Sequence, residues 1–161
     1  MIKLVENLPI AEIKSIMADP DIWPTISEDG QDVEEFEPQT GDLFQYLGIY
    51  ANGDLAGMFL VHADGLTCVK VHMSLFKPFR LLYALQAVES LIGWFTTLPK
   101  RIQKLNADIP EYNDGAIRLA TESGFTLEGA NRQSIMKDGK LYDQLRFGMT
   151  RKEAVELCLA R

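Results

Sequence analysis

The stretch Asn-Asp-Gly-Ala-Ile-Arg-Leu-Ala-Thr-Glu-Ser-Gly-Phe, at residues 113–125, decides the fold of this 161-residue chain. Asn113 is a residue type that favours a helix N-cap, and apolar residues follow it at helical spacing. Gly124 stands where a helix can end in the left-handed conformation, which glycine adopts at little cost. The stretch therefore predicts a short capped helix that leads directly into a strand.

The segments on either side of this helix predict a chain of alternating strands and helices. Asn52-Gly53 is a strong signal for a tight hairpin, and Thr150 to Glu153 has the pattern of a capping box. The strand after the long apolar helix is expected to pair in parallel with the strand before it. The expected strands are residues 2–5, 43–51, 55–62, 66–75, 102–109, 125–136 and 140–149, and the expected helices begin at Pro9, Phe79, Asn113 and Thr150.

Composition predicts one cytoplasmic domain spanning residues 1–161. The chain is 47% hydrophobic, which is enough for a proper core, and it has no apolar run of membrane-spanning or signal-peptide length. Its two cysteines, Cys68 and Cys158, are expected to be buried reduced thiols rather than disulfide or metal-binding residues. The net charge of −7 disfavours nucleic-acid binding.

Acidic residues are concentrated in the first part of the chain. Residues 1–60 contain twelve acidic and only two basic residues, so the remaining part is slightly basic. The acidic stretch at residues 27–42 has little periodicity, and we expect a loop with at most one helical turn. It is either a solvated insertion or a lid in which Glu34, Glu35 and Glu37 attract a cationic acceptor.

The closing motif, N-x-x-A-x-x-L-x-x-x-x-G-F followed by Leu127-Glu128-Gly129, resembles that of the GCN5-related N-acetyltransferases (GNAT superfamily). The order of elements agrees with this family over nearly the whole chain. Three shorter segments are similar to those of small GNAT-like proteins from tailed phages and prophages, namely Asp21-Ile22-Trp23, Lys70-Val71-His72 and Asp138-Gly139-Lys140-Leu141. The resemblance implies an α/β (α+β) fold: a mixed, mostly antiparallel sheet with a central parallel pair and helices on both faces.

The resemblance also implies that acetyl-CoA lies in a gap between the two parallel strands. Its pantetheine arm would bond to the backbone of Met73, Ser74 and Leu75, and Asn113 matches a position whose amide helps to hold the cofactor. Asn113 could equally serve only as an N-cap. The pyrophosphate would bind to the backbone N–H groups at the start of the following helix. The family's loop there has glycines, which this chain lacks at the matching residues, namely Arg80, Leu81, Leu82, Tyr83, Ala84 and Leu85.

The reaction that the resemblance implies needs a base, and a histidine is suited to this role near neutral pH. His72 is the first candidate and His62 the second, although a lone strand histidine is often structural. Many family members have a tyrosine as general acid where this chain has Ala120. Three tyrosines could replace it from elsewhere, but packing roles are expected for them: Tyr83, Tyr112 and Tyr142. No metal site is expected.

Two functions remain open from the sequence. In the first, the protein is an acetyl-CoA-dependent N-acetyltransferase that acts directly on the amine of a small molecule or a protein. In the second, the fold is a catalytically degenerate scaffold, such as a phage structural, assembly or interaction protein with a partner in the virion. A homodimer is open in both. The first interpretation requires that Leu81 and Tyr83 leave the gap between the strands open.

Overall fold

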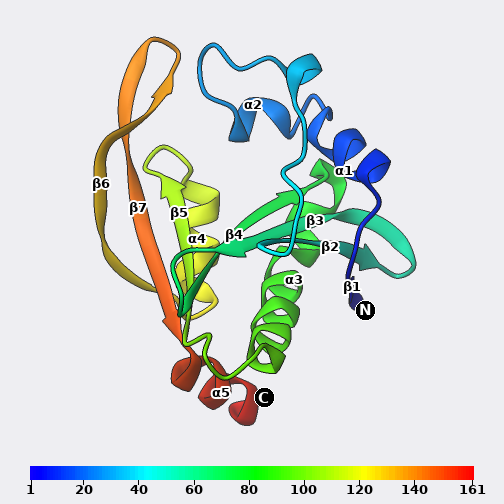
Figure 1. Ribbon diagram of the computed structural model, residues 1–161, viewed down its shortest axis with the longest axis vertical. Coiled ribbons are helices and arrows are strands. Elements are labelled where there is room, and N and C mark those ends of the chain that lie inside the picture. Colours follow the sequence, from blue (N-terminus) through cyan, green and yellow to red (C-terminus); the bar gives the residue numbers. More distant parts are fainter.

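A seven-stranded sheet with the order β1-β2-β3-β4-β5-β7-β6 runs through the computed structural model, which describes residues 1–161 (Figure 1). Its strands are β1 (Ile2–Val5), β2 (Phe44–Ala51), β3 (Asp54–Ala63), β4 (Cys68–Leu75), β5 (Lys104–Pro110), β6 (Thr126–Lys137) and β7 (Lys140–Thr150). Its helices are α1 (Ile10–Met17), α2 (Trp23–Ile26), the 3-10 helix η1 (Val33–Glu35), α3 (Lys77–Thr97), α4 (Asp114–Glu122) and α5 (Arg151–Ala160).

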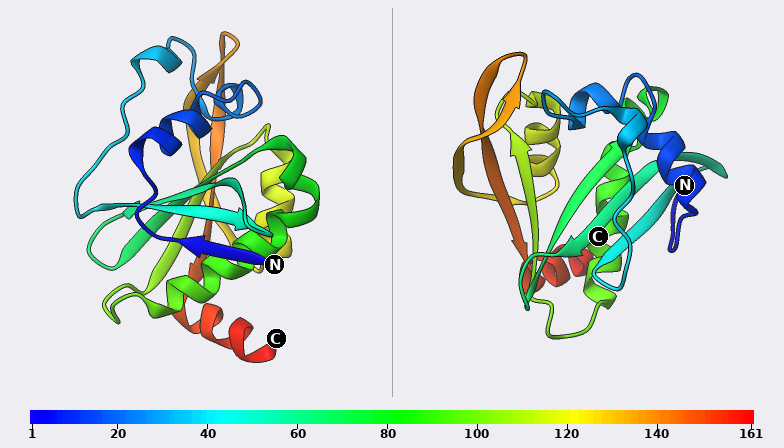
Figure 2. Two further views of the ribbon diagram at one scale, coloured as in Figure 1. Left: turned by 90° about the vertical axis from the view of Figure 1, so that its right-hand side faces the viewer. Right: turned by 45° about the horizontal axis from the view of Figure 1, so that its top comes forward.

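The sheet forks at its centre. β4 and β5 form its single parallel pair, as predicted, and all other neighbours are antiparallel. The parallel pairing covers only Cys68 to Lys70 of β4 and Lys104 to Asn106 of β5. Beyond these residues the two strands separate, and Figures 1 and 2 show them meeting near α5 and spreading apart towards α2. The predicted gap between the parallel strands is therefore present.

Each face of the sheet has its own hydrophobic core. The larger core lies under α3, α4 and α5, with fully buried residues such as Phe59, Phe95 and Met149. The smaller core lies under α1 and includes Ile13 and Ile16. Because successive strand side chains point to opposite faces, β3 contributes to both cores. The predicted helices on both faces are confirmed.

The local signals of the sequence act as predicted. The Asn113 side chain caps α4 by accepting a hydrogen bond of 3.2 Å from the Ala116 amide. Gly124 has a φ of +93° directly after α4, and the Asn52-Gly53 turn has positive φ at both residues. Thr150 and Glu153 form the reciprocal bonds of a capping box at the start of α5. These residues fix the ends of the elements around the fork.

Helix α3 begins earlier than the sequence indicated. It starts at Lys77 rather than Phe79, directly after β4, with Pro78 in its first turn. Proline is well suited there because the first amides of a helix have no partner within the helix and its φ is already helical. Residues 80–85, where the resemblance places the family's loop at the start of the helix, lie within α3. A one-turn helix, α2, was also not predicted, and Pro24 again lies in its first turn.

The cysteine prediction is partly wrong. Both thiols are free, as expected, but Cys68 is only half-buried and Cys158 is exposed on α5. No helix in the protein combines the length and apolarity that a bilayer-spanning segment needs.

A glycine in β3 lets the strands pack closely beside the fork. Gly57 has a φ of +153°, and a Cβ there would lie 2.0 Å from the Ser74 carbonyl oxygen. We expect Gly57→Ala to lower the free energy of unfolding by at least about 2 kcal/mol because β4 must move. Gly129 is a matched control, since it has a φ of +154° with nothing within 4 Å of a Cβ. Urea unfolding of both variants checks this, and equal losses would contradict the steric explanation.

Candidate functional site

A cavity of about 280 Å³ occupies the fork between β4 and β5, and we call it the fork cavity. Its walls come from the unpaired parts of both strands and from the inner sides of α3 and α4. Thirteen of its 20 lining residues are hydrophobic. Residues that define its walls are Val71, His72 and Met73 of β4, Ala107, Asp108 and Ile109 of β5, Val88 and Leu91 of α3, and Ala116, Leu119 and Ala120 of α4.

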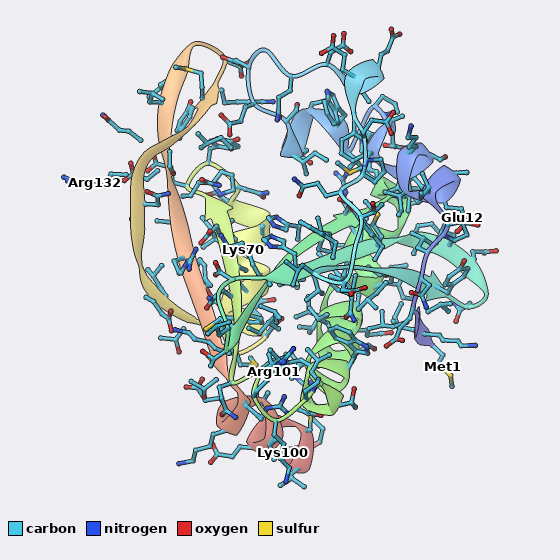
Figure 3. All side chains as sticks on the ribbon, in the orientation of Figure 1. Met1, Glu12, Lys70, Lys100, Arg101 and Arg132 are labelled. Carbon is cyan, nitrogen blue, oxygen red and sulfur yellow. The ribbon has the colours of Figure 1, made fainter.

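Charged side chains join the strands where they begin to separate. Lys70 is the last paired residue of β4, and its Nζ lies 2.7 Å from Asp108 on β5. In Figure 3 the labelled Lys70 lies near the centre of the molecule. Arg146 of β7 donates two hydrogen bonds to Asp108, of 2.6 and 2.7 Å, and one of 3.2 Å to Asp64. We call Asp64, Lys70, Asn106, Asp108 and Arg146 the vertex cluster.

The vertex cluster keeps a carboxylate ionised next to the fork cavity. Burial opposes the charge of Asp108, but hydrogen bonds from Arg146 and Lys70 outweigh this and lower its pKa. No role was predicted for these residues from the sequence. Strand alternation places Lys70 on the same face of β4 as His72, but its partners come from β5, β7 and the turn after β3.

A second cavity, of about 340 Å³, lies beside the first on the α1 side of the sheet, and we call it the side cavity. Its floor is β2, β3 and β4, and its roof is α2 with the segment that follows it. Only Ile26 and His72 line both cavities. The two spaces therefore meet between a side chain from the roof and a histidine from the floor.

His72 is paired with the other histidine of the chain. The two Nε2 atoms lie 3.0 Å apart, and the rings are nearly parallel. His62 Nδ1 lies 3.0 Å from the Ala63 carbonyl oxygen, which can only accept, so we assign the His62 proton to Nδ1. Nε2 of neutral His62 then accepts from Nε2 of His72. This arrangement leaves Nδ1 of His72 with a free lone pair.

His72 stays neutral in this environment. His72 is exposed, and its side chain lines both cavities. Burial, followed by the nearby His62 and Lys70, lowers the pKa of His72 to about 4, while Asp108 acts in the opposite direction. At neutral pH the ring is consequently an uncharged hydrogen-bond acceptor that can take a proton.

A strap formed by residues 27–29 closes the roof over this site. Asp29 accepts hydrogen bonds from the amides of Asp138 and Gly139 in the β6–β7 turn, at 2.9 and 2.7 Å. The Asp29 amide donates to the Met136 carbonyl, and Lys137 Nζ donates to the Ser27 carbonyl. The backbone hydrogen bonds lower the pKa of Asp29. The acidic segment expected to be a loop is thus tied to the hairpin on the far side of the fork.

The β4 residues predicted to bind the cofactor lie in different places. Met73 lines the fork cavity, whereas Ser74 faces the side cavity. Leu75 is buried in the larger core, and its carbonyl oxygen accepts a hydrogen bond from Arg80 Nε. Asn113 lines the fork cavity, while its side chain also caps α4. His72, Met73 and Asn113 are therefore the predicted site residues that the structure brings together.

Residues 80–85, which the resemblance assigns to the pyrophosphate, are helical. Arg80 donates hydrogen bonds to the carbonyl oxygens of Leu75 and Asp21, and so holds the α1–α2 segment against the end of β4. None of the six residues lines the fork cavity. Leu81, Leu82 and Leu85 are exposed, Ala84 is half-buried, and the Tyr83 hydroxyl accepts from Asn52 Nδ2. Leu81 and Tyr83 do not close the gap.

The other predicted candidates are distributed around the site. Ala120 is buried and lines the fork cavity. Tyr112 and Tyr142 pack edge to face, with ring centroids 4.8 Å apart, and neither lines a cavity wall. Of the acidic residues of the loop, Glu37 lines the side cavity and its carboxylate lies 2.7 Å from Lys14 Nζ. Glu34 and Glu35 are exposed outside both cavities.

A sheet that forks within its parallel pair, with helices on both faces and a cavity in the fork, defines the fold of the GCN5-related N-acetyltransferases. Solved structures of that class superpose over almost the whole chain. A chimera of spermidine N-acetyltransferase SpeG from Vibrio cholerae and hSSAT gives a TM-score of 0.79 at 14% identity, covering 96% of this chain and 98% of that one. Vibrio cholerae spermidine N-acetyltransferase in complex with CoA and spermine gives 0.74 at 15% identity, with the same coverage.

One curated relative is a phage-derived protein, in agreement with the resemblance noted from short motifs. It is the SPbeta prophage-derived uncharacterized N-acetyltransferase YokL of Bacillus subtilis (strain 168). The chain is 27% identical to it over 118 residues, which are 70% of this chain and 64% of that protein. The match thus spans less than two thirds of the relative's length. No family model matches the chain.

The histidine pair makes a prediction for solution measurements. Because the chain has only two histidines, each imidazole signal can be followed in an NMR titration. We expect His72 to titrate near pH 4 and to show the Nε2–H tautomer, since burial and His62 disfavour its charged form. His62→Gln should raise the pKa of His72 because one of the lowering influences is removed.

The lowered pKa of His72 also determines how this residue affects stability as the pH changes. Between about pH 6.5 and 4 the unfolded chain binds the proton more readily, so the contribution of His72 to stability falls as the pH falls. A His72 that titrates near its ordinary value of 6.5 would contradict the geometry of the pair.

Proposed function

We propose that the protein is an acetyl-CoA-dependent N-acetyltransferase that transfers the acetyl group directly to a primary amine. One observation carries this proposal: the fork cavity and the side cavity meet at His72. Two substrates can thus approach one neutral imidazole from opposite sides. The N-acetyltransferase name of the curated relative and the N-acetyltransferase fold support the proposal.

The fork cavity fits the thioester end of the donor. Its apolar walls suit the pantetheine arm, and β4 beyond Lys70 has backbone groups that are not paired with β5. Met73 and Asn113 are the side chains expected beside this arm. Residues 80–85 contain no glycine, so their backbone cannot approach a phosphate as closely as a glycine loop can. We therefore assign only the acyl and pantetheine part to this cavity.

His72 would act as the general base. Bound acetyl-CoA supplies the acetyl thioester carbon that the amine attacks. As the nitrogen–carbon bond forms, the amine nitrogen becomes acidic enough to pass its proton to Nδ1 of His72, and the carbon–sulfur bond breaks. His62 keeps the proton of His72 on Nε2, and so keeps Nδ1 available. A pKa near 4 means that His72 is in the accepting form throughout the neutral range.

The alternative of a degenerate scaffold requires a site that cannot receive a donor. Exposed Leu81 and the Tyr83–Asn52 hydrogen bond leave the fork cavity open. The absence of the family's glycines at residues 80–85 affects the surface where phosphate would lie, and not the space beside His72. These observations favour the enzyme over the scaffold.

Donor binding can be tested without an acceptor. A ligand at about 100 times its dissociation constant adds about 2.7 kcal/mol to the free energy of unfolding. We expect acetyl-CoA to raise the melting temperature in a thermal-shift titration, because the fork cavity binds it only when the sheet is folded. No shift at millimolar acetyl-CoA would contradict the proposal. Ala116→Trp, which places a large ring in the fork cavity, should abolish the shift and serves as the blocked control.

The base can be tested separately from binding. We expect His72→Gln to lower kcat at least about 100-fold, which is the lower range for loss of a general base. The acetyl-CoA thermal shift should remain, since glutamine keeps a polar side chain of similar size. Steady-state acetyl transfer and thermal shift on the same preparation check this. Undiminished turnover between pH 6 and 8 would remove His72 from the mechanism.

A further inference from the structure

The side cavity is lined mainly by apolar and aromatic side chains. Seven of its twelve lining residues are hydrophobic, and its volume of about 340 Å³ lies at the lower end of the range for small-molecule sites, about 300–1000 Å³. Trp23 and Phe36 contact each other edge to face, with ring centroids 5.9 Å apart. Tyr46, Met58 and Leu60 come from the sheet below them. Such walls favour an apolar body of about the size of an aromatic ring.

Polar groups without partners gather at one end of this cavity. Ser74 is only 8% exposed, and its hydroxyl makes no hydrogen bond within the protein. This hydroxyl is not fully buried, so it is available to a polar group of a ligand in the cavity. His72 lies two residues earlier on the same face of β4, and its Nδ1 is also free. The two side chains are about 7 Å apart along the strand, which is enough to hold one amine between them.

The charges around the cavity disfavour a ligand with several ammonium groups. Glu37 is the only acidic residue in its walls, and Lys14 Nζ lies 2.7 Å from that carboxylate. A polyamine would place additional ammonium groups against apolar side chains without counter-charges, which is costly. The vertex cluster offers no free carboxylate, because Lys70 and Arg146 neutralise Asp108 and Asp64.

We propose that the side cavity selects a small amine with a single nitrogen joined by a short chain to an aromatic ring, in short an arylalkylamine. This inference rests on the proposed function, because it names the acceptor class of the same site. The ring would pack against the aromatic wall formed by Trp23 and Phe36, and the nitrogen would lie between Ser74 and His72. This class of amine differs from spermidine and spermine, the polyamines that occur in the names of the structural neighbours.

Binding can be measured by the fluorescence of the tryptophan in the cavity wall. The chain has two tryptophans, and Trp94 lies on α3 with its Nε1 hydrogen-bonded to Glu6. In the Trp94→Phe protein Trp23 is the only fluorophore of its kind. We expect 2-phenylethylamine to change this fluorescence saturably, and spermidine to bind at least about 10-fold more weakly. Equal or tighter binding of spermidine would overturn the inference.

Two variants test the contacts in that background. Phe36→Ala should weaken binding of 2-phenylethylamine about 10-fold, and Ser74→Ala should weaken it several-fold. Phe79→Ala removes an equally half-buried ring from α3 outside the cavity and should leave binding unchanged. Unchanged binding in both cavity variants would overturn the inference.

Turnover distinguishes failure of the inference from failure of the proposed function. With acetyl-CoA as donor, we expect kcat/KM to be at least about 10-fold higher for 2-phenylethylamine than for spermidine. A preference for spermidine would overturn the acceptor class while leaving acetyl transfer intact. Tight binding of 2-phenylethylamine without acetylation of any amine in the panel would instead overturn the proposed function.

Discussion

The site depends on the early end of the hydrogen bonding between β4 and β5. A sheet whose strands remain paired has no interior space, since neighbouring strands lie about 4.8 Å apart. Here the pairing stops after Lys70 and Asn106, and the strands separate around a cavity. Backbone groups that leave a ladder lose their partners, so this arrangement needs compensation. The vertex cluster joins the strands at this point through side chains, because Asp108 pairs with Lys70 across the start of the fork and with Arg146 from the next strand.

Around this fork, each wall of the site comes from a different part of the chain. The β4 floor carries His72, the roof comes from residues 22–39, and the β6–β7 hairpin holds the roof through Asp29. The Arg80 side chain performs a similar task at the other end, where it joins Asp21 to the end of β4. The roof is consequently fixed at two points, with Ile26 above His72 between them. This explains why two cavities meet at one residue rather than merge into an open groove.

Much of the fold could be predicted from local patterns. Strand alternation, the Asn52-Gly53 turn and the caps at Asn113 and Gly124 act within a few residues, so the sequence carries their signals directly. His72 could be selected because histidine chemistry is suited to the reaction that the resemblance implied. Its pairing with His62 could not be derived, since it depends on the diagonal register of two strands, which places Leu60 rather than His62 opposite His72.

The parts that could not be predicted are long-range or lie where the chain departs from the family pattern. Asp29 meets the Asp138 amide across 109 residues, and Arg146 meets Asp108 across 38. Neither contact is indicated by a periodic pattern in the sequence. At residues 80–85 the family pattern has a glycine loop, whereas here these residues are helical and none of them lines the fork cavity.

Ala120 stands where many family members have a tyrosine as general acid, and this difference affects the proposed chemistry most. Alanine at this buried position lines the fork cavity and leaves it without a phenol. A thiol has a pKa of about 8.5, so a thiolate leaves near neutral pH with little help from an acid. An attacking amine, in contrast, must lose a proton whatever its leaving group. Such a site can therefore lack the tyrosine more readily than the base, which agrees with a structure in which His72 lines the fork cavity and no tyrosine does.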